Sequence, residues 1–190
     1  MAETDLILVV AKLVEELRQA GTSPTDQDWN RLAAQISNGF NARKEEVAIL
    51  RLSRDTAMLS FIFPIKLAFV GAIPLTTTHS LAAKTIREKR GEFVNNFASY
   101  KHATVFEAVD LSDDEKAVPI QKIMSSPMIV DGKVVGVIQI SRKARQGDPV
   151  GHDFTHADLA QLSSIGAVLG KYVSELPAPS LARPKPPTKE

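Results

Sequence analysis

The 190-residue sequence contains no cysteine. This absence excludes disulfides, thiolate metal sites, thiolate catalysis and the covalent attachment of a chromophore through a thioether. The formal net charge is only +1, with 23 Lys and Arg against 22 Asp and Glu. No global field therefore attracts nucleic acid or a membrane surface, and we expect neither as a partner.

Long apolar runs are also missing. The longest near the N-terminus covers residues 6–17, which is too short to span a bilayer, and it includes Lys12, Glu15 and Glu16. No positively charged region precedes this run and no cleavage site comes after it, so the pattern of a signal peptide is not met. We expect a cytoplasmic protein.

Catalytic patterns do not stand out either. The sequence shows no Ser/His/Asp order, no Gly-rich phosphate loop and no distinct pair of catalytic carboxylates. His152 and His156 are four residues apart, a spacing that can bind a metal on a helix, but His152 precedes the expected helix start. We therefore expect no enzyme activity, no metal and no cofactor.

Helix signals are clear at both ends of the sequence. Apolar residues at spacings of three and four predict an amphipathic helix over 6–17, ending near Gly21. Thr25 with Asp28 and Thr155 with Asp158 have the spacing of capping boxes, so helices should start there. A fourth helix is predicted over 80–90, with Gly91 as its left-handed terminator.

Strand signals occupy the middle of the sequence. Branched aliphatic residues predict a strand over 47–52, and alternating apolar residues predict a second over 59–67. Pro64 interrupts the second pattern, which places this strand at an edge or gives it a bulge. A short strand is predicted over 92–95.

Residues 96–121 lose periodicity but keep several apolar side chains, which indicates a packed, irregular excursion. Ser112 to Glu115 has the form of a capping box for one turn. The stretch 177–190 is rich in proline and lacks a core pattern, so we expect a disordered tail or linker. The single domain then covers residues 1–176.

The segment 123–140 predicts a hairpin that turns at Asp131-Gly132. Counting outward from this turn pairs Pro127 with Gly136 at a position without hydrogen bonds, where proline's missing donor costs nothing. The same register places Met124, Ser126, Met128, Val135, Val137 and Gln139 on one face. Both faces are largely apolar, so both should be covered.

An ordered series of segments resembles a GAF domain over about residues 5–175. The stretch SLAAKTIREKRGEFVNN is similar to that family's helix, glycine and short strand. IMSSPMIVDGKVVGVIQI is similar to its proline-bearing strand, turn and glycine-bearing strand, and FTHADLAQLSSIGAVLGKYV to its closing helix. The N-terminal helix and the first pair of strands complete the series.

This resemblance implies an α+β fold, with a central antiparallel sheet, terminal helices on one face and a covered ligand pocket on the other. It implies a sensory or regulatory module that acts on a separate signalling output protein. Phe106 and Asp110 have the spacing of the cyclic-nucleotide-binding branch, but Leu111 replaces its Glu, so that ligand is not expected. The methionine sulfoxide reductase branch depends on cysteine chemistry and is excluded.

Two hypotheses remain. In the first, a small ligand binds between the sheet and the 96–121 segment, and the terminal helices relay its presence. In the second, side chains fill the pocket and the domain serves as a homodimer through the stripes of residues 6–17 and 159–176. The candidate ligand-binding residues lie in or just before the excursion, or on the hairpin face given above: Asn95, Asn96, Tyr100, His102, Phe106, Asp110, Met124, Ser126 and Gln139.

Overall fold

The structure, a computed structural model, describes residues 3–99, 118–145 and 147–177. Its main helices are α1 (Glu3–Ala20), α2 (Asp26–Gly39), α4 (Leu81–Glu88) and α5 (His156–Glu175), with short helical turns η1 (Lys44–Glu46), α3 (Ile65–Ala68) and η2 (Phe97–Ser99). Its strands are β1 (Val47–Ser53), β2 (Met58–Phe63), β3 (Ala72–Pro74), β4 (Glu92–Val94), β5 (Ile120–Val130) and β6 (Lys133–Lys143).

The six strands form one antiparallel sheet in the order β3-β2-β1-β6-β5-β4. The long hairpin β5–β6 lies near the middle of this sheet, with β1 on the far side of β6. This arrangement is the α+β fold that the sequence predicts. No helix among the described residues is long and apolar enough to cross a membrane.

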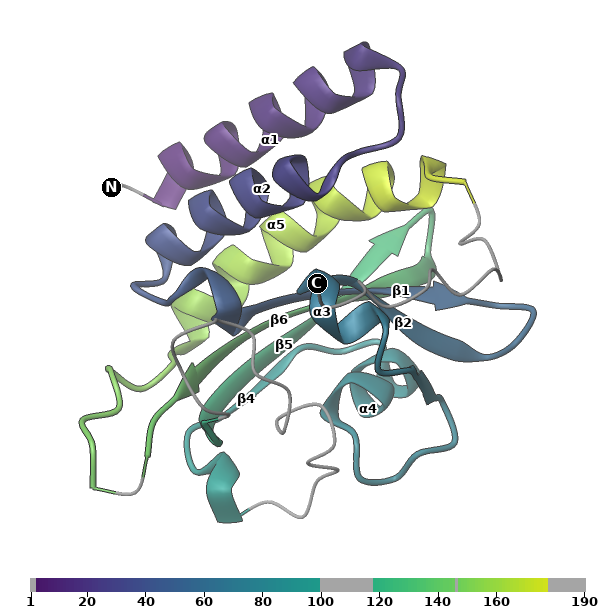
Figure 1. Cartoon of the computed structure of the whole chain (residues 1–190). Helices are drawn as coiled ribbons and strands as arrows, with labels where there is room; N and C mark the ends of the chain where they lie inside the picture. Colours follow the sequence, from purple (N-terminus) through teal and green to yellow (C-terminus); the bar gives the residue numbers. More distant parts are fainter. Residues whose placement is uncertain (1–2, 100–117, 146, 178–190) are drawn as a thin grey trace, which may run out of the picture.

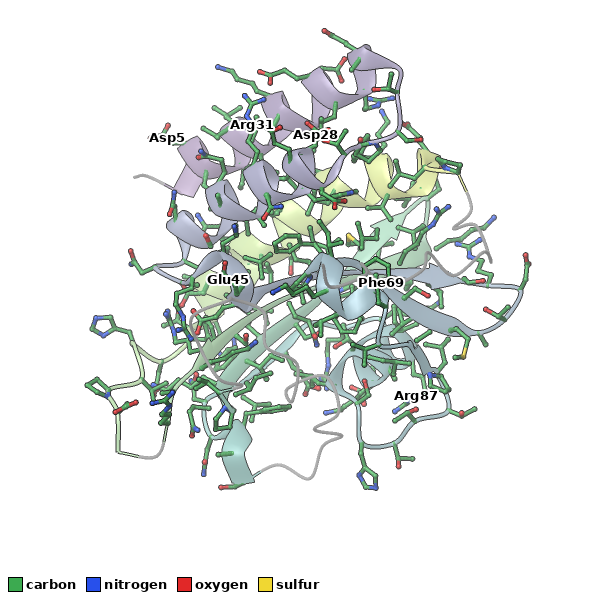
Figure 2. All side chains as sticks on the ribbon, viewed as in Figure 1. Asp5, Asp28, Arg31, Glu45, Phe69 and Arg87 are labelled. Atoms are coloured by element: carbon green, nitrogen blue, oxygen red, sulfur yellow. The ribbon has the colours of Figure 1, made fainter. Side chains whose placement is uncertain are left out.

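The two faces of the sheet are covered differently (Figure 1). Helices α1, α2 and α5 form a layer on one face, which we call the helix face, and they share a large apolar core with the sheet. Helix α4 lies on the opposite face, which we call the cavity face, where a smaller apolar cluster joins it to the sheet. Figure 2 labels Asp28 and Arg31 of α2 on the helix face and Arg87 of α4 on the cavity face.

Local capping signals predict the helix starts correctly. The Thr25 side chain accepts from the Asp28 amide at 3.3 Å, and the Asp28 carboxylate accepts from the Thr25 amide at 2.8 Å. Thr155 and Asp158 make the same pair of bonds at the start of α5. Each box satisfies backbone N–H groups that have no partner inside the helix.

The apolar stripes of α1 and α5 are used inside the monomer. The same core buries apolar side chains from both helices: Leu6, Val10 and Leu13 of α1, and Leu162 and Leu169 of α5. A salt bridge from Arg18 to Glu175 at 2.8 Å also joins the two helices. The prediction that these stripes form a dimer interface is therefore wrong, because their side chains already pack against their own sheet and each other.

The second strand is shorter than the alternating pattern predicts. β2 ends at Phe63, Pro64 precedes the helical turn α3, and β3 pairs along the outer side of β2. The expectation of a strand through residue 67 is wrong. Of the two alternatives for its position, β2 is not an edge strand, but it has the predicted bulge, because its register with β1 shifts between Phe61 and Phe63. Proline lacks the N–H that would continue the ladder.

Helix α4 ends earlier than the glycine signal predicts. Lys89, not Gly91, takes the left-handed conformation at its C-terminus, with φ of 52°. Gly91 is needed for a different reason, since a Cβ there would lie 3.0 Å from a methyl carbon of Leu159 and 3.1 Å from the carbonyl oxygen of Ser125. This glycine permits close packing of the chain between β5 and α5.

The hairpin turns at Asp131-Gly132 as predicted, with φ of 48° and 72°. Its register nevertheless differs, because Met128 pairs with Gly136 and Pro127 pairs with Val137. Val135 is the extra residue of a β-bulge between these pairs and the turn. The predicted pairing of Pro127 with Gly136 is therefore wrong.

The bulge moves residues between faces, because side chains alternate along a strand and a shift of one residue exchanges the two sides. Met124 and Ser126 now share the helix face with Ile138 and Ile140, while Gln139 lies on the cavity face. The glycines of α5 also face the hairpin. A Cβ at Gly166 would lie 3.4 Å from the carbonyl oxygen of Pro127, so this glycine serves close contact between helix and sheet.

The expected excursion over 96–121, its single turn at Ser112 to Glu115 and the expected tail over 178–190 lie wholly or largely outside the described residues.

Candidate functional site

A cavity of about 390 Å³ opens on the cavity face of the sheet. Strands β1, β2, β5 and β6 supply its floor, and the N-terminal end of α4 and the segment around β3 supply its walls. This volume is within the range of about 300–1,000 Å³ that is typical of small-molecule pockets. The cavity is thus large enough for a small organic molecule.

Most of the lining is apolar. Phe61 and Ile123 come from the sheet, Leu81 from the start of α4, and Ile73 from β3. Phe97 of η2 packs with Leu81 and Ile123 in a small buried cluster at one end. These side chains would contact the apolar body of a ligand.

Arginine 87 holds one wall in place. Its Nη1 atom donates to the carbonyl oxygens of Leu75 at 2.6 Å and Thr77 at 3.0 Å, in the loop between β3 and α4. Thr77 and His79 of this loop line the cavity. Arg87 itself extends from α4 on the cavity face, as Figure 2 shows.

A buried carboxylate closes another side of the cavity. Glu46 is only 6% exposed, and one of its oxygens accepts from the Lys143 amide at 2.6 Å. The other accepts from the Arg43 amide at 2.8 Å. Glu46 therefore ties η1 to the end of β6, and both of its oxygens are engaged by main-chain donors. Glu45, labelled in Figure 2, lines the cavity beside it.

The polar floor consists of Gln139 and Ser141, neighbours on the same face of β6. They are 9% and 6% exposed, and both line the cavity. The Gln139 side chain donates from Nε2 to the Ser125 hydroxyl at 3.1 Å. The Ser141 hydroxyl donates to the carbonyl oxygen of Glu46 at 3.2 Å. The geometry thus fixes both side chains at the base of an apolar cavity.

The candidate residues from the sequence do not gather at one place. The amide of Asn95 donates to the Phe154 carbonyl at 3.0 Å, and its carbonyl accepts from the Phe154 N–H at 2.9 Å. Asn95 therefore anchors the loop before α5 and does not line the cavity. Asn96 is exposed and accepts from the Ser99 hydroxyl at 3.0 Å. Asn96 therefore acts as a local turn partner, whereas Asn95 joins two segments that are far apart in the sequence.

Of the three hairpin candidates, only Gln139 lines the cavity. Met124 is fully buried in the core on the helix face. Ser126 bonds the Ser163 hydroxyl of α5 at 3.0 Å. The other four candidates, Tyr100, His102, Phe106 and Asp110, lie outside the described residues.

The histidine pair gives no sign of a metal site. His156 contacts the ring of Phe93 edge-on at 5.1 Å between centroids, and His152 is exposed. Across residues 3–99, 118–145 and 147–177, no group of three potential ligands is close enough to hold a metal ion.

Sequence reasoning missed Ser125 because it assumed a regular ladder, and it missed Ser141 because the predicted hairpin ended at residue 140. A glycine inside a strand often marks a bulge or a close backbone approach, and Gly136 is such a glycine. A Cβ at Gly136 would overlap the carbonyl oxygen of Leu50 in β1. This signal, given weight, would have moved Ser125 to the cavity face and Ser126 away from it.

Comparisons with solved structures show the fold. The GAF domain of an Acinetobacter phosphoenolpyruvate-protein phosphotransferase superimposes with a TM-score of 0.63 at 13% identity, covering 92% of this chain and 95% of that one. Free methionine-R-sulfoxide reductase of Neisseria meningitidis, solved with its substrate, gives 0.60 at 13% identity, covering 90% and 88%. No protein-family model matches the sequence, and neither does any curated protein.

A further neighbour is the A. aeolicus nlh2 GAF domain in an inactive state, with a TM-score of 0.58, 13% identity, and coverage of 90% and 95%. The chain therefore has a GAF-like fold, as its sequence predicts. The neighbours include GAF domains and an enzyme, and a fold shared at this identity does not specify which activity is present.

Proposed function

We propose that the protein is a non-enzymatic sensory module that binds a small molecule in the cavity and relays its presence to a separate signalling protein. The observation that carries this proposal is a cavity with an apolar lining and a fixed polar floor at Gln139 and Ser141. Pockets for small ligands combine these two features. The regulatory GAF domains among the structural neighbours support the same class of function.

The relay is supported by the position of the hairpin. Gln139 of β6 lines the cavity, while its neighbours Ile138 and Ile140 pack in the core beneath the helices. Helix α5 lies directly on the hairpin at Gly166. A ligand that shifts β6 would therefore be felt by α5, and through the Arg18–Glu175 pair by α1.

Catalysis of the reductase kind is not proposed, because the chain has no cysteine. The buried Glu46 carboxylate does not replace that chemistry, since main-chain donors occupy both of its oxygens.

A homodimer is a second element of the proposal. With the apolar stripes buried, the outer side of α1 is the surface that supports it, since Leu8 is 54% exposed. Light scattering at high concentration should give the mass of a dimer, and Leu8→Glu should give the mass of a monomer. A monomer in both samples would remove the dimer but leave ligand binding untouched.

The central test is direct. The purified protein is denatured, and small molecules released from it are identified by mass spectrometry and added back to refolded protein. We expect a released compound to bind again with one-to-one stoichiometry in calorimetry. An empty extract, together with no binding in a fragment screen by NMR, would contradict the proposal.

A blocking variant places the ligand in this cavity. Ala48 of β1 lines the cavity and pairs across the sheet with Gln139. Ala48→Leu would add three carbons to empty space, so the protein should fold while affinity falls by about tenfold or more. Ala160→Leu, on the exposed side of α5, is the control that should bind as the wild type does. Unchanged affinity in Ala48→Leu would place the ligand elsewhere.

A further inference from the structure

A chain of hydroxyl groups runs from the cavity floor into α4. Thr85 Oγ1 lies 2.9 Å from the carbonyl oxygen of Leu81, one turn earlier in α4. Thr85 Oγ1 also lies 2.7 Å from Ser125 Oγ, which lies 3.1 Å from Nε2 of Gln139. Thr85 and Ser125 are 1% and 0% exposed, so no solvent proton enters the chain.

The carbonyl at one end gives this chain a direction. A carbonyl oxygen can only accept, so Thr85 must donate its single proton to Leu81. Thr85 then has only lone pairs for Ser125, and Ser125 must donate to Thr85. Ser125 in turn can only accept from Gln139, which requires the N–H of the amide at that position.

If the protons pointed the opposite way along the chain, the arrangement would contain one hydrogen bond fewer. If Thr85 donated to Ser125 and Ser125 to Gln139, the Thr85 hydroxyl oxygen would face the Leu81 carbonyl oxygen at 2.9 Å with no proton between them. Two bonds would then replace three, and two acceptors would repel each other in a buried place. The Gln139 amide is therefore held with its carbonyl oxygen directed away from Ser125.

The same logic applies to Ser141. Its proton is committed to the carbonyl of Glu46, so its oxygen offers only lone pairs to the cavity. None of the described residues donates to Oε1 of Gln139. The floor thus presents two hydrogen-bond acceptors, Oε1 of Gln139 and the hydroxyl oxygen of Ser141, which are two residues apart on β6. One N–H of the Gln139 amide also remains free of Ser125 and lies beside Oε1.

We infer that the cavity selects a small, largely apolar molecule with an N–H or O–H group that donates to Gln139, such as a carboxamide, urea or amino heterocycle. This inference rests on the proposed function, because it specifies the ligand of the same cavity. A ligand with only acceptors would leave Oε1 of Gln139 buried without a donor, which is costly.

The test uses two probes of nearly equal shape, benzamide and acetophenone, in which NH₂ is replaced by CH₃. Each is titrated into ¹⁵N-labelled full-length protein, and the side-chain amide signal of Gln139, assigned with Gln139→Met, reports binding at the site. We expect benzamide to bind about tenfold more tightly than acetophenone. Equal affinities would overturn the inference while leaving the proposed function in place.

Variants of residues that do not touch the ligand test the direction of proton donation along the chain of hydroxyl groups. Thr85→Val removes the acceptor of the Ser125 proton, which can then go to Gln139 and turn its amide around. The preference for benzamide should fall to about twofold or reverse. Ser125→Ala, which frees the amide, should have the same effect and serves if Thr85→Val does not fold.

Ser126→Ala is the matched control, because it removes an equivalent bond to α5 on the helix face and should keep the preference. A preference unchanged in Thr85→Val and Ser125→Ala would overturn the inference. If neither probe, nor any compound released from the protein, shifts the Gln139 signal, the proposed function fails and the inference fails with it.

Discussion

Ser125 and Ser126 are neighbours in β5, and their side chains leave the strand toward opposite faces of the sheet. Ser125 bonds Thr85 of α4, whose hydroxyl donates to Leu81 one turn earlier. Ser126 bonds Ser163 of α5, whose hydroxyl donates to Leu159 one turn earlier. Each face is therefore joined to its helix by a hydrogen bond between two hydroxyl groups, Thr85 with Ser125 on one face and Ser163 with Ser126 on the other.

The two chains of hydroxyls differ in how they continue from the serine. On the helix face the chain ends at Ser126, which is buried, while its partner Ser163 is exposed. On the cavity face the chain continues from Ser125 to Gln139, whose side chain lines the cavity. Under the proposed function, the comparison teaches that the same attachment of strand to helix can also orient a ligand-binding group, when the amide of Gln139 extends it to the cavity.

Large-to-small substitutions should show the largest difference between the faces. Leu169 of α5 is fully buried in the core on the helix face, whereas Leu81 of α4 lines the cavity. Leu169→Ala should lower the free energy of unfolding by about 4 kcal/mol, because it opens a new void in a closed core. Leu81→Ala should cost about 2 kcal/mol, because part of its surface already has no neighbour. Urea unfolding measures both, and equal losses would mean that the cavity face is as closely packed as the other.

The hairpin glycines provide the next test. A Cβ at Gly136 would overlap the Leu50 carbonyl and lie 2.5 Å from the terminal carbon of Met128. Gly136→Ala should therefore lower the unfolding free energy by about 2–3 kcal/mol, since main chain cannot give way easily. Gly166→Ala is the comparison, because its Cβ would find ordinary contacts of 3.4 Å or more. Helix propensity favours alanine there, so a loss above about 1 kcal/mol in Gly166→Ala would contradict this packing.

These glycines also explain how far the sequence predicts the fold. The starts of α2 and α5 depend on residues three apart, and the turn of the hairpin depends on Asp131-Gly132, so local signals suffice. The bulge at Val135 depends on β1, which approaches Gly136 from a segment far away in the sequence. A register that a third strand decides cannot be derived from the hairpin alone.

The prediction of the site residues is limited in the same way, because it depends on the register of the hairpin. The sequence predicts Gln139 as a polar side chain on a covered face, and it does line the cavity. A regular ladder groups Met124 and Ser126 with it, and the single bulged residue moves them to the other side. The end of α4 also differs from the prediction, because Lys89 takes the left-handed conformation that glycine usually adopts, and propensity does not reveal this.

The two serines offer a smaller but sharper comparison of stability. Ser126→Ala should lower the unfolding free energy by about 1 kcal/mol, the net value of one hydrogen bond. Ser125→Ala should cost about 2 kcal/mol, because it also leaves the buried N–H of Gln139 without its acceptor. Double mutation with Gln139→Leu should recover part of the second loss and none of the first. Equal costs for the two serines would mean that Gln139 does not depend on Ser125.

The smallest expected difference between the two faces is in how acid pH changes the stability that the start of each helix contributes. Hydrogen bonds from the Thr25 amide and hydroxyl lower the pKa of Asp28 at the start of α2. A group whose pKa is lower in the folded state stabilises the fold above its unfolded pKa, and this contribution is lost as the pH falls through the folded value. Asp28→Asn should therefore destabilise the protein at pH 7, and the difference from the wild type should shrink near pH 3.

Helix α4 is the control, because it starts at Ser80 without an acidic residue in its first turn. The Ser80 hydroxyl accepts from the Ala83 amide at 3.2 Å, a neutral bond that does not titrate. Ser80→Ala should cost about 1 kcal/mol at both pH values, the usual value of an N-cap. Urea unfolding of both variants at pH 7 and pH 3 gives the comparison. If the cost of Asp28→Asn stays constant with pH, its carboxylate charge does not stabilise α2, and the helices of the two faces start in equivalent ways.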